Sequence, residues 1–461
     1  MTIKAETRRR DTLRGGAGGS NGCLMTGETS ENRANRAPFA ILFGVSVATA
    51  MGNNGMLSVL PAIGRQIGIP DAMVAAIFSL SAVLWAITSP LWARQSDLRG
   101  RKPLIMLGLS GFCISMLLCA LVVSAGLHHL APPMVIFVLF LLCRALFGGV
   151  GSAANPATQA YMADRTSREE RTQTMATLAG AFGLGTVVGP LLAPLFVLPV
   201  VGLAGPMFAF ALIAAIMLVV VKRGLPETFK PGRGDTPPRR RTGLPWRGEG
   251  AALWRDPRLK PFLIYGFLVA ACQTAQTQTL GFLIIDKLGL PPVKAQGFIT
   301  LAMAAGAIAG LLAQWGLIRM FRMGPRELMR WGAGAAVLGN AVVAFAPDYA
   351  AVAIGYAIAC LGYGFARPGF TAGASLSVHA KDQAGAAGAI AAINGLNVVV
   401  APLFVLLYEK IGWGPFVLNA LILAAMLAYA LRQTVLRSVS DVGPEREATI
   451  AGLERSDEGG V

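Results

Sequence analysis

The sequence predicts an all-α integral membrane protein with twelve transmembrane helices arranged in two six-helix bundles. Of its 461 residues, 54% are hydrophobic and only 14% are charged, whereas an ordinary soluble domain carries about 25% charged residues. The chain contains twelve apolar segments of the roughly 20 residues that a bilayer-spanning helix needs. A single soluble core rarely grows beyond about 250–300 residues, so this much apolar sequence requires lipid as its solvent.

The predicted spans follow the apolar segments in chain order. In the first half they are 38–61, 72–93, 103–125, 132–157, 174–197 and 203–221. In the second half they are 260–284, 295–318, 328–346, 350–373, 384–408 and 414–431. These ranges predict two bundles, over residues 38–221 and 260–433.

The remaining segments are too polar to cross a membrane. Residues 222–259 contain several prolines and the run Arg239-Arg240-Arg241, so we expect a basic cytoplasmic linker. Residues 1–37 are polar and Gly-rich, and we expect a disordered cytoplasmic tail without a cleavable signal peptide. Met25 is an alternative start. Residues 434–461 form the second cytoplasmic tail.

The charge distribution predicts the orientation of the chain. The net charge of +16 would suit a nucleic-acid partner, but the basic residues lie between long apolar segments. The positive-inside rule explains this pattern better, so we expect no nucleic acid. If the N-terminus is cytoplasmic, the outer loops contain only four basic residues, which are Arg65, Lys287, Lys294 and Lys410. The other Lys and Arg residues then lie mostly on the cytoplasmic side. Both termini are therefore expected in the cytoplasm.

Metal and catalytic sites are not expected. The six cysteines include no C-x-x-C pair, and all but Cys23 lie in apolar segments. Three histidines, of which His128 and His129 are adjacent, do not have the spacing of a zinc site. Since no catalytic constellation or phosphate-binding loop is present, we expect neither an enzyme nor a cofactor.

The two halves repeat one another. The loop after the second span reads Asp97-Leu-Arg-Gly100-Arg101-Lys102, and the loop after the eighth span reads Phe321-Arg322-Met-Gly324-Pro-Arg326. Repeated six-helix halves are typical of transporters, whose substrate site lies between the halves near the middle of the membrane.

The loop after the second span is the most informative stretch. It combines Arg94, Asp97, Gly100, Arg101 and Lys102 at a tight turn. Gly100 permits a backbone shape that other residues resist, and Asp97 can face a helix N-terminus or an arginine. Such contacts would latch one conformation at the cytoplasmic side. A charged loop that only fixes topology is the alternative.

This loop resembles the signature loop of the major facilitator superfamily, usually written G-x-L-A-D-R-x-G-R-K. Asp97, Gly100, Arg101 and Lys102 match it, whereas Ala93 stands in place of the first glycine. Together with the twelve spans and the basic linker, the resemblance covers residues 38–433. It implies the major facilitator fold, a monomer in the bacterial inner membrane, and two bundles that rock about a central site.

The fourth span carries Arg144, about 11 residues into the segment and so near mid-depth. A charge at that depth needs a polar cavity or partner. The segment from Arg144 to Gly151 resembles the superfamily's R-x-x-x-G-x-G pattern, which implies proton transfer or substrate binding. A structural arginine bonded to helix carbonyls is the alternative. Asp164, at the end of this helix, either pairs with the signature loop or is a solvated charge.

The fifth span contains Gly185, Gly189 and Pro190. Glycines at this spacing allow close helix packing, and proline bends a helix. The segment resembles the antiporter motif G-x-x-x-G-P-x-x-G-G of the drug:proton antiporters, although Ala193 and Pro194 replace its last two glycines. Plain helix packing is the alternative.

Uncharged polar side chains are candidates to line the cavity. They are Asn53 and Asn54 in the first span, Gln273 and Gln276 in the seventh, and Asn394 in the eleventh. Amides can bind a polar substrate without carrying charge, and helix–helix bonding is their alternative role. Arg367 in the tenth span either attracts an anionic group together with Arg144 or extends to the inner surface.

Acidic residues are absent from the middle of every predicted span. Those nearest to a span interior are Asp97, Asp164, Asp286 and Glu409. Proton coupling through Asp97, Asp164 or Asp286 and facilitated diffusion both remain open. The resemblance implies export of a drug or metabolite by proton antiport with alternating access. Uptake or facilitated diffusion of a metabolite, and a non-transporting membrane scaffold, are the alternatives.

Overall fold

The computed structural model describes residues 27–166, 168–227, 256–378, 383–433 and 436. These residues are predominantly helical, and within these ranges the β-structure is a single isolated bridge between Leu198 and Gly202. Ten helices in the described part of the chain are long and apolar enough to cross a membrane. The chain is therefore a multi-pass membrane protein, as the composition predicts.

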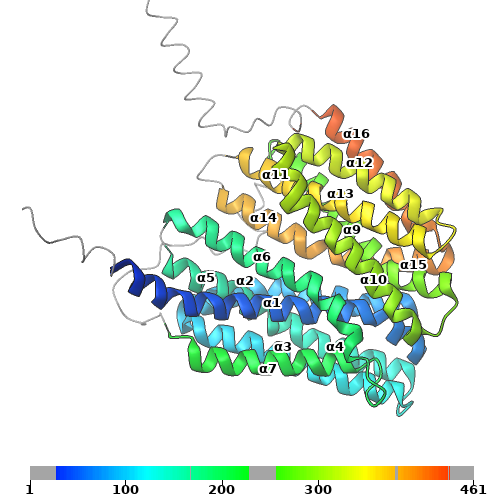
Figure 1. Cartoon of the computed structure of the whole chain (residues 1–461), viewed down its shortest axis with the longest axis horizontal. Coiled ribbons are helices and arrows are strands. Elements are labelled where there is room, and N and C mark those ends of the chain that lie inside the picture. The colour runs from blue at the N-terminus through cyan, green and yellow to red at the C-terminus, as the bar shows by residue number, and fades with distance from the viewer. Residues whose placement is uncertain (1–26, 167, 228–255, 379–382, 434–435, 437–461) are drawn as a thin grey trace, which may run out of the picture.

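The first half runs back and forth along one direction (Figure 1). Its elements are α1 (Gly27–Ile67), α2 (Asp71–Arg99), α3 (Arg101–Leu127), α4 (Pro133–Gly149), η1 (Gly151–Ala153), α5 (Ala154–Arg165), α6 (Arg168–Leu192), η2 (Ala193–Phe196) and α7 (Gly205–Gly224). The η1 turn joins α4 to α5, and together they cover the predicted fourth span.

The second half is built in the same way. Its elements are α9 (Lys260–Leu288), α10 (Pro292–Leu311), η3 (Leu312–Leu317), α11 (Ile318–Phe321), α12 (Pro325–Ala344), α13 (Tyr349–Leu376), α14 (Gln383–Leu396), η5 (Asn397–Val400), α15 (Ala401–Lys410) and α16 (Gly414–Arg432). A π-helical segment, η3, lies between α10 and α11.

Two predicted spans are helical but are not among the ten candidate spans. The ninth corresponds to α12, whose first turns carry Arg326, Glu327 and Arg330. The eleventh corresponds to α14, η5 and α15, so a short 3-10 turn divides it into two helices of 14 and 10 residues. The charges and the break lower the apolar length of these segments, and the count of twelve stays a prediction.

The N-terminal tail is shorter than predicted. Helix α1 begins at Gly27, whereas the sequence analysis assigned residues 1–37 to a disordered tail. Residues 27–37 contain Glu, Ala and Arg and no proline before Pro38, so their helix propensity lets the first helix extend backwards. The predicted tail residues 1–26, most of the basic linker (228–255) and the C-terminal residues 437–461 lie outside the described residues.

Close packing within each half relies on small residues. In the second half, a Cβ added at Gly362 of α13 would lie 2.5 Å from the backbone nitrogen of Ala336 in α12. In the first half, a Cβ at Gly108 of α3 would lie 2.2 Å from the backbone nitrogen of Ala154 in α5. Such contacts between backbones are typical of helices that associate in lipid, where van der Waals packing replaces the hydrophobic effect.

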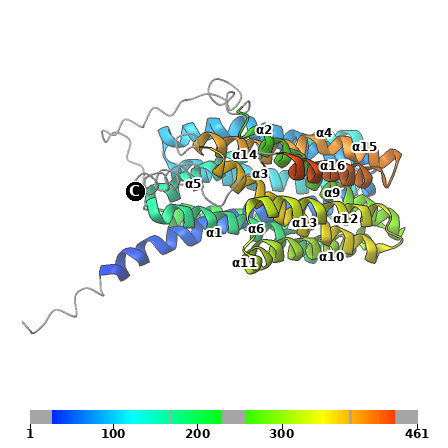
Figure 2. The ribbon, with the colours of Figure 1, turned by 90° about the horizontal axis from the view of Figure 1, so that it is seen from above.

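The two halves lie against one another as two groups of helices, blue to green and green to red, in Figure 1, and the two groups overlap in the view from above in Figure 2. Contacts between them join α1 to α9 and α10, α6 to α10, and α2 to α14, η5 and α15. Polar groups on α1, α2 and α9 therefore lie where the halves meet.

Candidate functional site

Arg144 of α4 is the most deeply buried charged residue of the described chain, with 1% of its surface exposed. Its Nη2 donates a hydrogen bond of 2.8 Å to the side-chain oxygen of Asn53 in α1. Within the described residues, its Nε and Nη1 atoms are buried without a hydrogen-bond partner. A buried N–H group that lacks a partner is costly, so these two donors are available to an acceptor that enters the site.

Aromatic rings hold the Arg144 guanidinium. Its central carbon lies 4.7 Å from the ring centre of Phe78 and 4.6 Å from that of Phe147. The Phe147 ring in turn lies 5.3 Å from the rings of both Trp85 and Phe112. A flat guanidinium suits such contacts because it is attracted to ring faces. These aromatic residues were not among those predicted from the sequence, although Phe147 follows Arg144 by three residues and so shares its helix face.

The seam between α2 and α4 fixes the position of Arg144. A Cβ added at Gly148 would lie 2.4 Å from the carbonyl oxygen of Ser81 in α2, so glycine is required for this approach. The indole nitrogen of Trp92 donates a hydrogen bond of 2.6 Å to the carbonyl oxygen of Gly149. Thr88 donates a second bond, of 3.0 Å, to the carbonyl oxygen of Gly148.

The glycines of the predicted antiporter motif lie in a second seam, between α6 and α1. A Cβ at Gly185 would lie 2.5 Å from the carbonyl oxygen of Val47, and a Cβ at Gly189 would lie 2.2 Å from that of Met51. Pro190 is inside α6 and is buried. The motif therefore brings α6 into backbone contact with the helix that carries Asn53.

Asn54 contributes to the same seam. Its side-chain nitrogen donates a hydrogen bond of 2.9 Å to the carbonyl oxygen of Ala50 and a longer one, of 3.4 Å, to the hydroxyl of Thr186 in α6. The structure therefore separates the two neighbouring asparagines, because Asn53 bonds to Arg144 and Asn54 to the α6 seam.

In the second half, Gln276 of α9 is fully buried, and both atoms of its amide lack a hydrogen-bond partner within the described residues. Gln273 is half-buried, and its backbone carbonyl oxygen accepts a hydrogen bond from the Thr277 hydroxyl. Asn394 is in α14, but its side chain lies outside the described residues. The structure thus gives Gln276 the unpaired donor and acceptor that a polar ligand needs.

Arg367 has a different environment from Arg144. It lies in α13 at an exposed position, and its carbonyl oxygen accepts a hydrogen bond of 3.0 Å from Thr371. The two arginines differ in exposure, because Arg144 is buried against the rings of Phe78 and Phe147 whereas Arg367 is exposed.

The signature loop forms a charged cluster at the C-terminal end of α2. Gly100 has a φ of +100°, which non-glycine residues rarely adopt, and it separates α2 from α3. Arg101 donates to the side chain of Asp97, and its Nε donates a bond of 3.0 Å to Asp164 at the end of α5. The predicted contact of Asp97 with an arginine and the predicted pairing of Asp164 with this loop are both present.

The other loop residues lie around this cluster. Lys102 donates a hydrogen bond of 2.9 Å to the carbonyl oxygen of Lys222 near the end of α7, whereas Arg94 is exposed. These contacts all join helices of the first half. No group of three His, Cys, Asp or Glu side chains within the described ranges is placed to hold a metal ion.

Comparisons with known proteins agree on one family. The model of the Major Facilitator Superfamily matches residues 42–402. The chain is 29% identical over 157 residues to the class D tetracycline resistance protein of Salmonella ordonez, which covers 33% of this chain and 36% of that protein. It therefore spans about a third of the length of that relative.

Two further similarities extend over most of the chain. The class G tetracycline resistance protein of Vibrio anguillarum is 24% identical over 379 residues, covering 78% of this chain and 87% of that protein. The crystal structure of the human organic anion transporter MFSD10 (TETRAN) matches with a TM-score of 0.60 at 19% identity, covering 86% of this chain and 99% of the other. The structural similarity shows the shared fold.

Proposed function

The chain belongs to the Major Facilitator Superfamily, and from that premise we propose that it is a secondary transporter that exports a small organic molecule, a drug or a metabolite. The observation that carries this proposal is the α1–α6 seam, where Gly185 and Gly189 press against the backbone of α1. This seam contains the segment that resembles the antiporter motif of the drug:proton antiporters. The similarity to tetracycline resistance proteins supports the same direction of transport.

The substrate site is proposed at Arg144 and Asn53 in the first half and Gln276 in the second. Among the described residues, two nitrogens of Arg144 and both amide atoms of Gln276 have no hydrogen-bond partner, which suits a polar or anionic group. The rings of Phe78 and Phe147 suit the apolar part of an organic molecule. Gln273, Asn54, Asn394 and Arg367 are secondary candidates.

The signature loop is proposed as the gate on the cytoplasmic side. Arg101 holds Asp97 and Asp164 together at the ends of α2, α3 and α5, so this cluster moves as one unit with the first half. Alternating access would then consist of rocking the two halves about the central site.

Protons are proposed as the coupling ion, which is the family expectation for antiport. The candidate carriers are Asp97, Asp164 and Asp286, with Arg144 modulating the pathway. We also propose a monomer in the bacterial inner membrane with both termini in the cytoplasm, because the Lys and Arg residues gather on that side.

Two other functions remain as alternatives. Uptake or facilitated diffusion of a metabolite is favoured by the absence of acids from the middle of the predicted spans, and the α1–α6 seam argues against it. A non-transporting scaffold with the same fold would tolerate substitution of Arg144.

The test is tetracycline accumulation in an efflux-deficient bacterium that expresses the parent chain, Arg144→Ala or the control Arg319→Ala. Arg319 is an exposed arginine at the end of α11, so its substitution matches the loss of charge without touching the proposed site. We expect the parent and Arg319→Ala to lower accumulation equally and Arg144→Ala to abolish the effect at equal membrane levels. A protonophore should also abolish it.

Other outcomes would redirect the proposal. Full activity of Arg144→Ala would exclude the assigned substrate site. Accumulation raised by the parent chain would indicate uptake. Unchanged tetracycline levels with all three chains would exclude this drug, and accumulation of labelled metabolites would then decide between export and uptake.

A further inference from the structure

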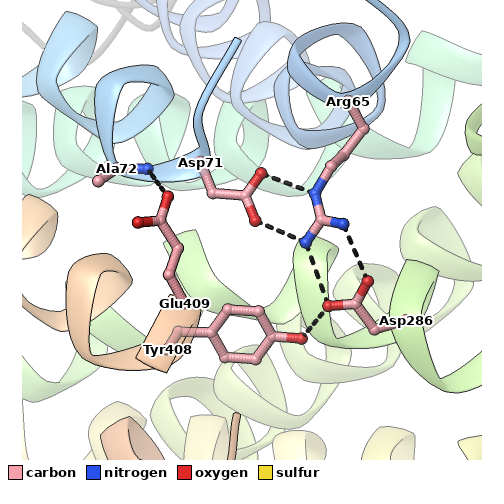
Figure 3. A network of polar contacts seen from close by, with 6 residues as sticks. All are labelled: Arg65, Asp71, Ala72, Asp286, Tyr408 and Glu409. Atoms are coloured by element: carbon pink, nitrogen blue, oxygen red, sulfur yellow. Dashed lines mark hydrogen bonds and ion pairs between the residues drawn. The ribbon is translucent and has the colours of Figure 1, made fainter. Parts of the chain in front are cut away.

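A second polar network joins the two halves at the end of the helices opposite the signature loop (Figure 3). Its members come from both halves: Arg65 of α1, Asp71 and Ala72 of α2, Asp286 of α9, and Tyr408 and Glu409 of α15. In the proposed orientation this is the outer side of the membrane. We call these six residues the outer network.

Arg65 is shared between the halves. Within the first half, its Nε and Nη2 donate bonds of 2.7 and 2.6 Å to the two carboxylate oxygens of Asp71. Across the interface, its Nη1 and Nη2 donate longer bonds, both of 3.1 Å, to the carboxylate of Asp286. Bidentate contacts of this kind are among the stronger hydrogen bonds in proteins.

The second half adds two further contacts. The Tyr408 hydroxyl donates a hydrogen bond of 2.5 Å to Asp286, which holds that carboxylate against Arg65. The Glu409 carboxylate accepts a bond of 2.9 Å from the backbone nitrogen of Ala72, in the first turn of α2. A carboxylate is stabilised at a helix N-terminus by the unpaired N–H groups and the helix dipole.

The network lies beside a closed part of the interface. Gln296 of α10 donates a hydrogen bond of 3.2 Å to the carbonyl oxygen of Ser58 in α1, and both residues have 1% of their surface exposed. A Cβ added at Gly281 of α9 would lie 2.5 Å from the side chain of Pro61 in α1. The halves are therefore in direct contact at this end of the molecule.

The two ion pairs of Arg65 are unequal, and this difference allows the pair that joins the halves to break and form again. When the halves separate, Arg65 loses Asp286 but keeps Asp71, so no unpaired arginine is left behind. Asp71 is buried, whereas the Asp286 side chain is 43% exposed and can be solvated. Since Asp71 competes with Asp286 for one guanidinium, it also weakens the contact across the interface.

We propose that the outer network is a latch that keeps the outer side closed, and that Asp71 sets its strength by competing for Arg65. Asp286, Tyr408 and Glu409 are the positioning residues contributed by the second half. Release of this latch opens the path by which substrate leaves. This inference rests on the proposed alternating-access export, but its test uses no substrate.

Opposite effects of two similar substitutions distinguish this latch from a merely structural cluster. Asp286→Asn removes the charge that Arg65 attracts across the interface, and we expect the outer side to open more often. Asp71→Asn removes the competing charge within the first half. Arg65 then interacts more strongly with Asp286, and we expect the outer side to open less often.

The readout is the labelling rate of a cysteine at position 58, introduced as Ser58→Cys, by a membrane-impermeant thiol reagent. Ser58 is buried at the closed interface, and its hydroxyl donates a hydrogen bond of 2.7 Å to the carbonyl oxygen of Gly55 in the same helix. Right-side-out and inside-out vesicles are labelled in parallel, and the chain without this cysteine gives the background from native thiols.

In right-side-out vesicles, Asp286→Asn should raise the labelling rate by about threefold to fivefold, as expected for a partly exposed ion pair, and Asp71→Asn should lower it. Asp286→Glu, which keeps the charge, should restore the parent rate. Asp348→Asn is the matched control, because Asp348 caps α13 through Ala351 and is outside the network. It should leave labelling unchanged.

The two substitutions decide the proposal. Equal rates in all variants, or a change in the same direction for Asp71→Asn and Asp286→Asn, would overturn the latch. Opposite changes support it even if tetracycline export fails, in which case the proposed function alone is rejected. Tyr408→Phe, which removes only the hydroxyl donor, provides a milder variant and should raise labelling less than Asp286→Asn.

Discussion

A buried guanidinium that has two nitrogens without a hydrogen-bond partner among the described residues, as at Arg144, is stable only where its surroundings make up for lost hydration. Here the surroundings supply one hydrogen-bond acceptor, the side-chain oxygen of Asn53, and two ring faces, those of Phe78 and Phe147. A desolvated contact between a cation and a ring contributes about 2 kcal/mol or more. The site therefore has room for a further hydrogen-bond acceptor. This is the property expected of an arginine that binds substrate.

The first prediction at this scale concerns the two neighbouring asparagines. Asn53→Ala should lower the initial rate of tetracycline efflux roughly tenfold or more, because a hydrogen bond to a charged group is worth about 1.5–3 kcal/mol. Asn54→Ala is the comparison, and its effect should be smaller because its bond to Thr186 is neutral and 3.4 Å long. Efflux is measured in energised cells and normalised to membrane protein. Equal losses in both variants would contradict the assigned role of Asn53.

The sequence was sufficient to predict part of this site. The depth of Arg144 in an apolar segment requires a polar partner, and that requirement is local. The identity of the partner is not local, because Asn53 is 91 residues away and meets Arg144 only when α1 packs near α4. Phe78 is on a third helix, so its place against the guanidinium depends on the α2–α4 seam.

At the scale of the elements, glycine positions decide how closely helices approach. Gly185 and Gly189 are in the α1–α6 seam, whereas a Cβ added at Gly180 or Gly183 of the same helix would have no described atom outside the helix's own backbone within 4 Å. The four glycines look alike in the sequence. Their spacing predicted a packing surface on α6, but not that its partner is the backbone of α1.

These glycines give a prediction with a control on the same helix. Gly189→Ala places a methyl group against the carbonyl oxygen of Met51, so the helices must move apart. Overpacking of this kind costs about 1–3 kcal/mol, and we expect a lower unfolding temperature in detergent and weaker tetracycline efflux. Gly183→Ala adds the same methyl group into open space and should leave both unchanged or slightly improved. Similar losses in the two variants would show that the seam is not the cause.

At the scale of the whole molecule, the two charged clusters have different roles. The signature cluster of Arg101, Asp97 and Asp164 joins helices within the first half, and the outer network joins the two halves. The contact between Asp97 and Arg101 could be predicted from the sequence because the two residues belong to one loop, whereas Asp164 comes from the end of α5, 63 residues from Arg101. From the sequence, Asp286 and Glu409 are only acids near span ends, because their contacts with Arg65 and Ala72 depend on how the halves dock.

The signature cluster gives the last prediction. Asp97→Asn removes one of two acids that hold Arg101, and Asp164 still holds the other side of the guanidinium. Because the Asp97 side chain is 44% exposed, its ion pair is worth at most about 1 kcal/mol. We therefore expect the maximal efflux rate to fall up to about fivefold, while the tetracycline concentration for half-maximal efflux stays the same. The cause is that the cluster helps position α2, α3 and α5 during cycling and does not touch the substrate.

Asp256→Asn, on the same side of the membrane before α9, is the control and should change neither value. An unchanged maximal rate with Asp97→Asn would exclude the gate, and a change in the half-maximal concentration alone would assign Asp97 to substrate binding.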